Sequence, residues 1–266
     1  MTNIQIKPMS HRGSDFERKE VLSSIASGGF SAAGWNKNCP TGMQNKHIKW
    51  MGVGFMALLL GCSSYQPALA ERPIPFGPER KQLTREYLQE HYGLPGEEAT
   101  IEPRMIVLHW TAIPSLEGSY EAFRPERLPN ARGDIQGGGA LNVSAHYLID
   151  RDGTIYHLMP DTVMARHTIG LNHCAIGIEN VGGTAETPLT KEQFRANKWL
   201  VRELSGKYPI EYLIGHYEYT LFDGHPLWLE QDSGYRTEKT DPGEAFMAEM
   251  RKALGDLNFK PLPENQ

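Results

Sequence analysis

The sequence has few cysteines, no long apolar run and no excess of basic residues. Its three cysteines, Cys39, Cys62 and Cys174, form no CxxC pair, which argues against a thiolate zinc knuckle and against a disulfide framework. No apolar run reaches the roughly 18 residues of a membrane-spanning helix. The formal net charge is -5, so the chain lacks the basic surface that non-specific nucleic-acid binding needs, and we expect no nucleic-acid partner.

Residues 43–62 have the pattern of an export signal. Lys46 and Lys49 precede an uncharged apolar stretch, Met51–Gly61, which is too short to span a bilayer. The stretch ends in Leu-Leu-Gly-Cys at Cys62, which resembles the lipobox of bacterial lipoproteins. We therefore predict a lipoprotein signal peptide over 43–61 and lipidation of Cys62. The alternative is a short buried helix that ends at a chance cysteine.

The residues around this signal set the expected location and domain plan. Ser63 follows Cys62. The resemblance to sorting signals then implies that the protein is located at the periplasmic face of the outer membrane and contacts the membrane through its lipid anchor. Residues 1–42 are rich in Ser, Gly and Asn. We expect them to be disordered, or to precede the true start at Met43; the other interpretation is an unusually long n-region.

After the signal, the sequence predicts a tether and one folded domain. Residues 62–80 contain four prolines and are expected to form an extended tether. The domain is predicted over 81–258, followed by a tail over 259–266, and we expect a monomer. The chain after Cys62 is long enough for one well-buried domain.

Apolar patterning predicts the elements of this domain. Short β-rich apolar runs predict strands, and amphipathic stretches predict helices. Strands are expected over 105–112, 175–181 and 212–216, with a hairpin over 144–159 that turns at Asp152-Gly153. Helices are expected over 81–92, 190–208 and 243–254, the second with a capping box from Thr190 to Gln193. The predicted fold is a single α/β domain with a mixed central β-sheet flanked by helices.

Three polar residues stand where these strands end or in a following loop. They are His109, His216 and Asp241. Two imidazoles and one carboxylate are a ligand set of catalytic zinc, which leaves a fourth position open for water. Their spacing matches no short metal motif, so the residues alone leave open that the histidines are hydrogen-bonded core or rim residues.

Two further charged residues suggest chemistry at the same place. Glu179 lies within an apolar strand, where a carboxylate is costly to bury unless it is paired or functional. It is either the partner of a neighbouring cation or a general base that acts on water. Lys239 lies two residues from Asp241, where it either stabilises an oxyanion or is a solvated surface lysine.

Five motifs in order carry a resemblance to a known family. They are Val107–Ala112, Asn142–Ile149 with Arg151-Asp152-Gly153, Ala165–Thr168, Ile176–Glu179 and Lys239–Pro242. Together they resemble the zinc-dependent N-acetylmuramoyl-L-alanine amidases of the AmpD/AmiD-like branch, over about Arg104 to Leu254. The resemblance implies zinc bound by His109, His216 and Asp241, Glu179 as catalytic acid/base, and Lys239 as transition-state partner. It also implies a substrate-facing position for His167.

The resemblance sets the expected activity and its alternatives. It implies hydrolysis of the amide between N-acetylmuramic acid and L-alanine in peptidoglycan or muropeptides. A non-catalytic peptidoglycan-binding module and a zinc peptidase acting on the stem peptide are the alternatives. The family's Trp-His-Ala-Gly motif reads Arg-His-Thr-Ile-Gly at 166–170. The segment 218–238 is either a loop beside the cleft or an ordinary surface insertion.

Overall fold

The computed structural model describes residues 65–95, 98–129 and 137–264. The predicted signal peptide over 43–61, the lipidation site Cys62 and residues 1–42 lie outside these ranges. Across the described ranges, no helix is both long enough and apolar enough to cross a membrane.

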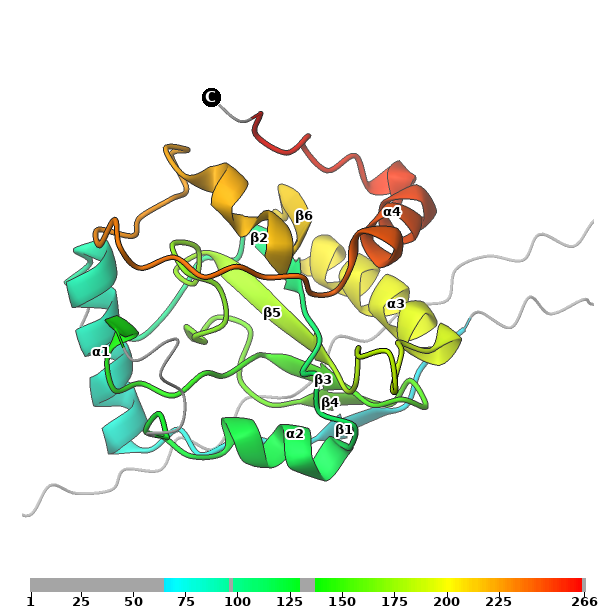
Figure 1. Ribbon diagram of the computed structural model, residues 1–266, viewed down its shortest axis with the longest axis horizontal. Coiled ribbons are helices and arrows are strands. Elements are labelled where there is room, and N and C mark those ends of the chain that lie inside the picture. The colour runs from blue at the N-terminus through cyan, green and yellow to red at the C-terminus, as the bar shows by residue number, and fades with distance from the viewer. Residues whose placement is uncertain (1–64, 96–97, 130–136, 265–266) are drawn as a thin grey trace, which may run out of the picture. The chain divides into compact units, whose positions relative to one another are not determined.

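Within the described residues, six strands form one mixed sheet (Figure 1). The strands are β1 (Leu69–Glu71), β2 (Met105–Leu108), β3 (Tyr147–Ile149), β4 (Ile155–His157), β5 (Ala175–Asn180) and β6 (Tyr212–Gly215). Their order is β1-β4-β3-β5-β2-β6. Only the β3–β4 hairpin is antiparallel among these pairings. The predicted mixed α/β fold and its hairpin are confirmed.

The register of the central strands decides where the polar residues emerge. Leu108, at the end of β2, lies opposite Ile178 of β5 and Gly215 of β6. Because these three strands are parallel, the residues directly after this register position lie side by side near the carboxyl edge of the sheet. His109, Glu179 and His216 are therefore brought to one place by strand pairing alone.

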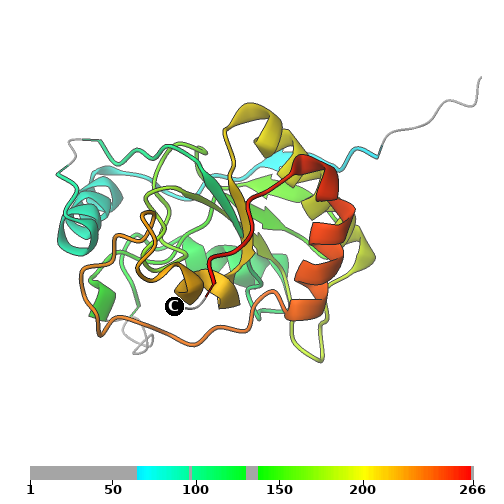
Figure 2. The ribbon, with the colours of Figure 1, turned by 90° about the horizontal axis from the view of Figure 1, so that it is seen from above.

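Helices cover both faces of the sheet. They are α1 (Pro78–Tyr92), α2 (Leu116–Phe123), α3 (Lys191–Lys207) and α4 (Glu244–Ala253), with two 3-10 turns, η2 (His216–Phe222) and η3 (Gly255–Leu257). Side chains alternate along β2, so that Ile106 and Leu108 pack with α3 and α4 while Met105 and Val107 pack on the other face. Figure 1 and Figure 2 both show α1 and α4 on opposite sides of the sheet.

Local sequence explains how the main helices begin and end. The predicted capping box of α3 is present, because Thr190 accepts from the Gln193 backbone and Gln193 reaches back to Thr190. Helix α1 has proline at its first position, where a missing N–H costs nothing, and ends at Gly93 in the left-handed region. This helix begins at Pro78, three residues before the predicted start.

The predicted tether over 62–80 is wrong from residue 69 onward. Residues 69–71 form the edge strand β1, paired with β4, and Ile74 is buried. The prolines flank this strand or begin α1, where they are tolerated, instead of interrupting regular structure. At the other end, the Lys260 N–H donates to the Glu211 carbonyl. The folded domain therefore extends beyond the predicted bounds of 81–258.

Candidate metal and catalytic site

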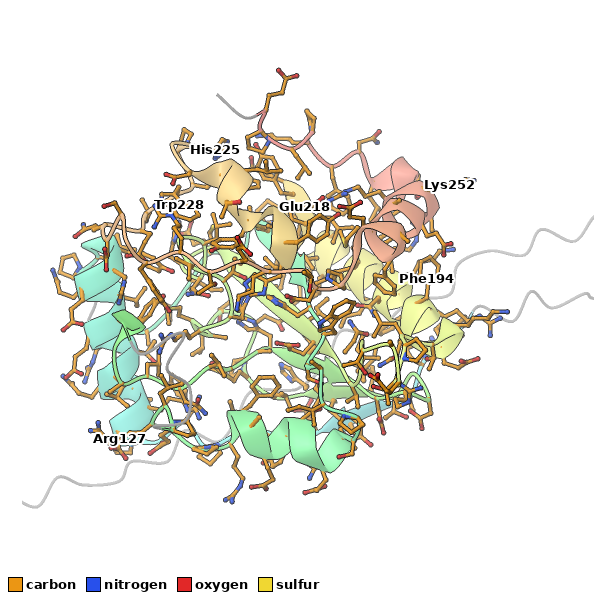
Figure 3. All side chains as sticks on the ribbon, in the orientation of Figure 1. Arg127, Phe194, Glu218, His225, Trp228 and Lys252 are labelled. Atoms are coloured by element: carbon orange, nitrogen blue, oxygen red, sulfur yellow. The ribbon has the colours of Figure 1, made fainter. Side chains whose placement is uncertain are left out.

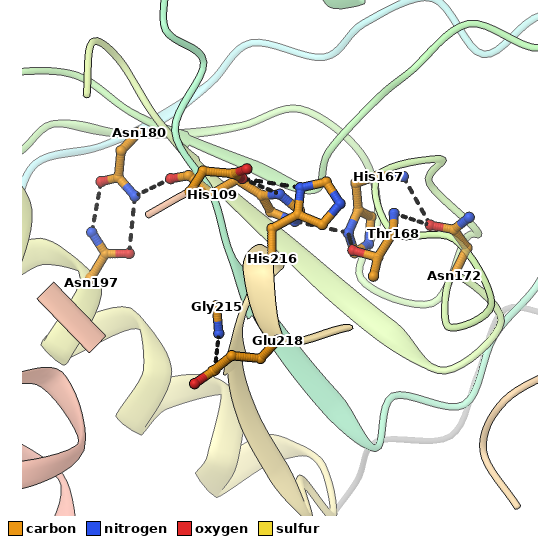
Figure 4. Close-up of polar contacts among 10 residues, drawn as sticks. His109, His167, Thr168, Asn172, Asn180, Asn197, Gly215, His216 and Glu218 are labelled. Atoms are coloured by element: carbon orange, nitrogen blue, oxygen red, sulfur yellow. Dashed lines mark hydrogen bonds and ion pairs between the residues drawn. The ribbon is translucent and has the colours of Figure 1, made fainter. Parts of the chain in front are cut away.

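The two candidate histidine ligands stand at the carboxyl ends of neighbouring strands. His109 directly follows β2, and its backbone still pairs with β5 through its N–H to the Ile178 carbonyl at 2.8 Å. His216 directly follows β6 and begins η2. The two imidazoles lie with their ring centroids 4.4 Å apart, beside each other in Figure 4.

Asp241 completes the predicted triad from a distant loop. Its carbonyl accepts from the Tyr217 N–H at 3.0 Å, which ties the loop to the start of η2. Its Oδ2 lies 3.1 Å from Nδ1 of His109 and 3.0 Å from Nδ1 of His216. The possible ligand atoms of the three residues all lie within 4.8 Å of one another.

The protonation of this triad suits a divalent cation. Burial, with the neighbouring His216, lowers the pKa of His109 to about 4. Burial alone would raise the pKa of Asp241, but the two imidazoles hold it well below its usual range. A neutral imidazole and an ionised carboxylate are the forms that coordinate metal. Two nitrogens and one oxygen that converge in this way fit catalytic zinc.

The triad faces a cavity of about 160 Å³ that also receives Glu179 and Lys239. Glu179 is 9% exposed and lies on the cavity face of β5, while Ile178 packs on the opposite face under α3. Lys239 is half-buried. The structure therefore brings all five predicted metal and catalytic residues to one cavity.

Comparison with known proteins identifies the family of the chain. Residues 99–244 match the model of the N-acetylmuramoyl-L-alanine amidase family. The chain belongs to this family. A segment of 85 residues is 31% identical to the endolysin of Enterobacteria phage K11; it covers 30% of this chain and spans about half (56%) of the phage protein. The family resemblance predicted from the sequence is thus confirmed.

The comparison with solved structures matches two amidases over most of the chain. A selenomethionine derivative of AmpD has 24% identity and a TM-score of 0.45, covering 71% of this chain and 96% of that one. The amidase LysC from Clostridium intestinale URNW has 23% identity and a TM-score of 0.43, covering 73% of this chain and all of that one.

His167 lies against the candidate ligand triad of this amidase-family chain. Its Nδ1 is 3.1 Å from Nε2 of His109, and its ring is 8% exposed while still lining the cavity. Burial, with the neighbouring His109, lowers the pKa of His167 well below its usual value. A direct contact between His167 and substrate stays a prediction.

Arg166 stands where the family motif has tryptophan. Its guanidinium donates to the Leu141 carbonyl and, at 2.8 Å, to the Tyr235 hydroxyl. Arg166 is buried, and with Tyr235 it lines the same cavity as the triad. A hydrogen-bonded cation therefore occupies a position that the family motif fills with an indole ring.

The 218–238 segment divides into packed and cleft-lining parts. Phe222 is fully buried, and Trp228 stacks on Tyr219 with ring centroids 6.0 Å apart. Tyr235, by contrast, lines the cavity. Glu218 lies in η2 and Trp228 in the chain that follows it (Figure 3). Only part of the predicted loop therefore borders the cleft.

Two polar networks that support the site were not predicted. Asn180 Nδ2 donates to the His109 carbonyl at 2.9 Å, and Asn197 Nδ2 of α3 donates to Asn180 Oδ1 at 2.7 Å (Figure 4). Glu218 Oε2 accepts from the Gly215 N–H at 2.8 Å and pairs with Arg251. One sequence signal was available, because Asn197 interrupts the apolar face of a strongly amphipathic helix.

Proposed function

We propose that this protein is an N-acetylmuramoyl-L-alanine amidase. It hydrolyses the amide between N-acetylmuramic acid and L-alanine in peptidoglycan or muropeptides. The observation that carries the proposal is the single cavity that contains the ligand triad, Glu179 and Lys239. Membership of the amidase family supports the same reaction.

Zinc is the proposed cofactor, held by His109, His216 and Asp241. When bound, it supplies Lewis acidity that polarises the scissile carbonyl and lowers the pKa of a coordinated water. The three ligands come from separate segments, and the β2–β6 register and the contact from Asp241 to Tyr217 fix their relative positions.

The remaining chemistry falls to Glu179 and Lys239. Glu179 is held by the β5 ladder, where it pairs with Leu148 of β3. It accepts the proton of the attacking water and delivers it to the leaving amine of L-alanine. Lys239 offsets the negative charge that develops on the carbonyl oxygen. Loss of one such stabilising group typically lowers the rate by roughly 10²–10³-fold.

The test separates proton transfer from metal binding. Glu179→Gln should abolish turnover of a purified muropeptide, while bound zinc, measured by elemental analysis, stays stoichiometric. Glu203→Gln is the matched control, because Glu203 is exposed on α3, which packs on the other face of the sheet. Wild-type turnover by Glu179→Gln would remove Glu179 from the mechanism.

We also propose that the protein is a lipoprotein of the outer membrane, exposed to the periplasm. The proposal rests on the charged, apolar and Leu-Leu-Gly-Cys pattern that ends at Cys62. In a Gram-negative host, the protein should incorporate labelled palmitate and fractionate with outer membranes, whereas Cys62→Ser should do neither. Labelling of the Cys62→Ser variant would contradict lipidation at that residue.

A further inference from the structure

His167 joins a candidate metal ligand to the backbone of the central sheet. On one side, its Nε2 lies 3.2 Å from the carbonyl oxygen of Ala175 in β5. On the other side, its Nδ1 lies 3.1 Å from Nε2 of His109. Figure 4 shows the His167 ring next to His109 on the side away from Asn180.

These contacts fix which nitrogen of each ring carries the proton. A carbonyl oxygen only accepts, so Nε2 of His167 is the protonated nitrogen and donates to Ala175. In the neutral ring, Nδ1 of His167 is then an acceptor. His109 must donate to it from Nε2, so in the neutral His109 ring Nδ1 carries a lone pair. This lone pair faces the Asp241 carboxylate at 3.1 Å, an arrangement that is favourable only when a cation lies between the two atoms.

We propose that His167 is a positioning residue. It holds His109 in the tautomer that can coordinate the metal through Nδ1. This inference deepens the proposed function and rests on it for the presence of zinc at the triad. Metal-bound histidines commonly donate their other ring N–H to a fixed acceptor, and loss of that acceptor typically costs about 10- to 100-fold in metal affinity. Here the acceptor is a second imidazole.

Neighbouring residues hold the backbone and the ring of His167 in place. Asn172 Oδ1 accepts from the His167 N–H at 2.8 Å and from the Thr168 N–H at 2.7 Å, which closes the loop around the ring. Gly177 lies directly against the ring, because an added Cβ there would stand 2.7 Å from Cγ of His167. The Thr168 hydroxyl lies 2.8 Å from Nδ1 of His167 and donates to the same nitrogen as His109 does.

Two substitutions of His167 distinguish a hydrogen-bond acceptor for His109 from a side chain that only fills the space. Counted in bonds from Cβ, the side-chain oxygen of asparagine matches Nδ1, whereas the amide end of glutamine matches Nε2. His167→Asn keeps an acceptor beside His109, and His167→Gln keeps only the contact with Ala175. We therefore expect His167→Gln to bind zinc about 10- to 100-fold more weakly than the unsubstituted protein, and His167→Asn to bind more tightly than His167→Gln.

Zinc affinity is measured by competition with a chromophoric chelator, and the cobalt-substituted protein gives a second readout. A perturbed cobalt absorption spectrum is expected for His167→Gln and a near-native one for His167→Asn. Wild-type zinc affinity in His167→Gln would overturn the proposal, and so would equal losses in both variants. A raised KM at unchanged zinc affinity would instead support the substrate-facing role.

A measurement on the unsubstituted protein covers the case in which a variant does not fold. Nitrogen-15 NMR of the zinc-loaded protein should show His109 protonated at Nε2 and His167 protonated at Nε2. A His167 protonated at Nδ1 would overturn the proposal. The zinc-affinity, cobalt-spectrum and NMR readouts involve no hydrolysis, so they stand or fall separately from the proposed activity.

Discussion

Gly177→Ala is the substitution whose effect the structure specifies most closely. Gly177 lies inside β5, paired with Val107 of β2. An added Cβ would stand 2.7 Å from Cγ, 2.8 Å from Cδ2 and 2.9 Å from Nδ1 of His167. These distances are well inside van der Waals contact for carbon, so either the imidazole or the strand must move.

Neither partner moves easily. The His167 ring is held by the Ala175 carbonyl and the Thr168 hydroxyl, and β5 is a buried central strand with neighbours on both sides. Overpacking of such a site typically costs about 1–3 kcal/mol. We therefore expect the free energy of unfolding of the metal-free protein to fall by about that amount. Zinc affinity should fall too, because the displaced ring no longer holds His109.

The assay is urea unfolding of metal-free protein, with zinc competition on the folded variant. Gly206→Ala is the control, since a Cβ at this position in α3 meets no atom within 4 Å. Alanine in a helix is favoured over glycine by roughly 0.5–1 kcal/mol, so the control should unfold at higher urea. Wild-type stability together with wild-type zinc affinity in Gly177→Ala would refute the reasoning.

Three further predictions concern separate parts of the domain. Asp241→Asn should lose bound zinc and activity together, by elemental analysis and turnover; stoichiometric zinc in this variant would count against the triad. Asn197→Ala should lower the free energy of unfolding by about 1–3 kcal/mol in urea titrations, since the buried Oδ1 of Asn180 loses the Asn197 donor. Burial alone would raise the pKa of Asp161, but the nearby His157 and hydrogen bonds from Lys207 and Tyr147 hold it well below its usual range. The stability that ionised Asp161 contributes is therefore present above about pH 4 and lost as pH falls. Asp161→Asn should thus reduce the loss of folding free energy between neutral and acid pH, and an unchanged loss would contradict this.

The central strands and the two candidate histidine ligands could be predicted from sequence because they share one cause. Apolar runs such as Met105–Leu108 mark buried strands, and a polar residue directly after such a run stands at the sheet edge. Strand pairing then brings His109 and His216 together without further information. Asp241 was not predictable in this way, because a loop places it. Its residue type completed a possible zinc ligand set, and the family motifs then strengthened that assignment.

The elements that sequence reasoning missed lack a periodic signal. Strand β1 has three residues and stands at the edge of the sheet, so its side chains show no buried alternation. Helix α2 is short, and Gly118 lies within its first turn. The supporting contact from Asn197 to Asn180 joins residues 17 positions apart, and no local pattern indicates which buried polar groups meet.

The products formed from a purified muropeptide test the central claim most directly. The zinc-loaded protein should release an N-acetylmuramic acid with a free lactyl carboxylate and a peptide with a free L-alanine amine, both identified by mass spectrometry. A chelator should stop the reaction, and added zinc should restore it. Cleavage within the stem peptide, or binding of the muropeptide with no new ends, would contradict the account.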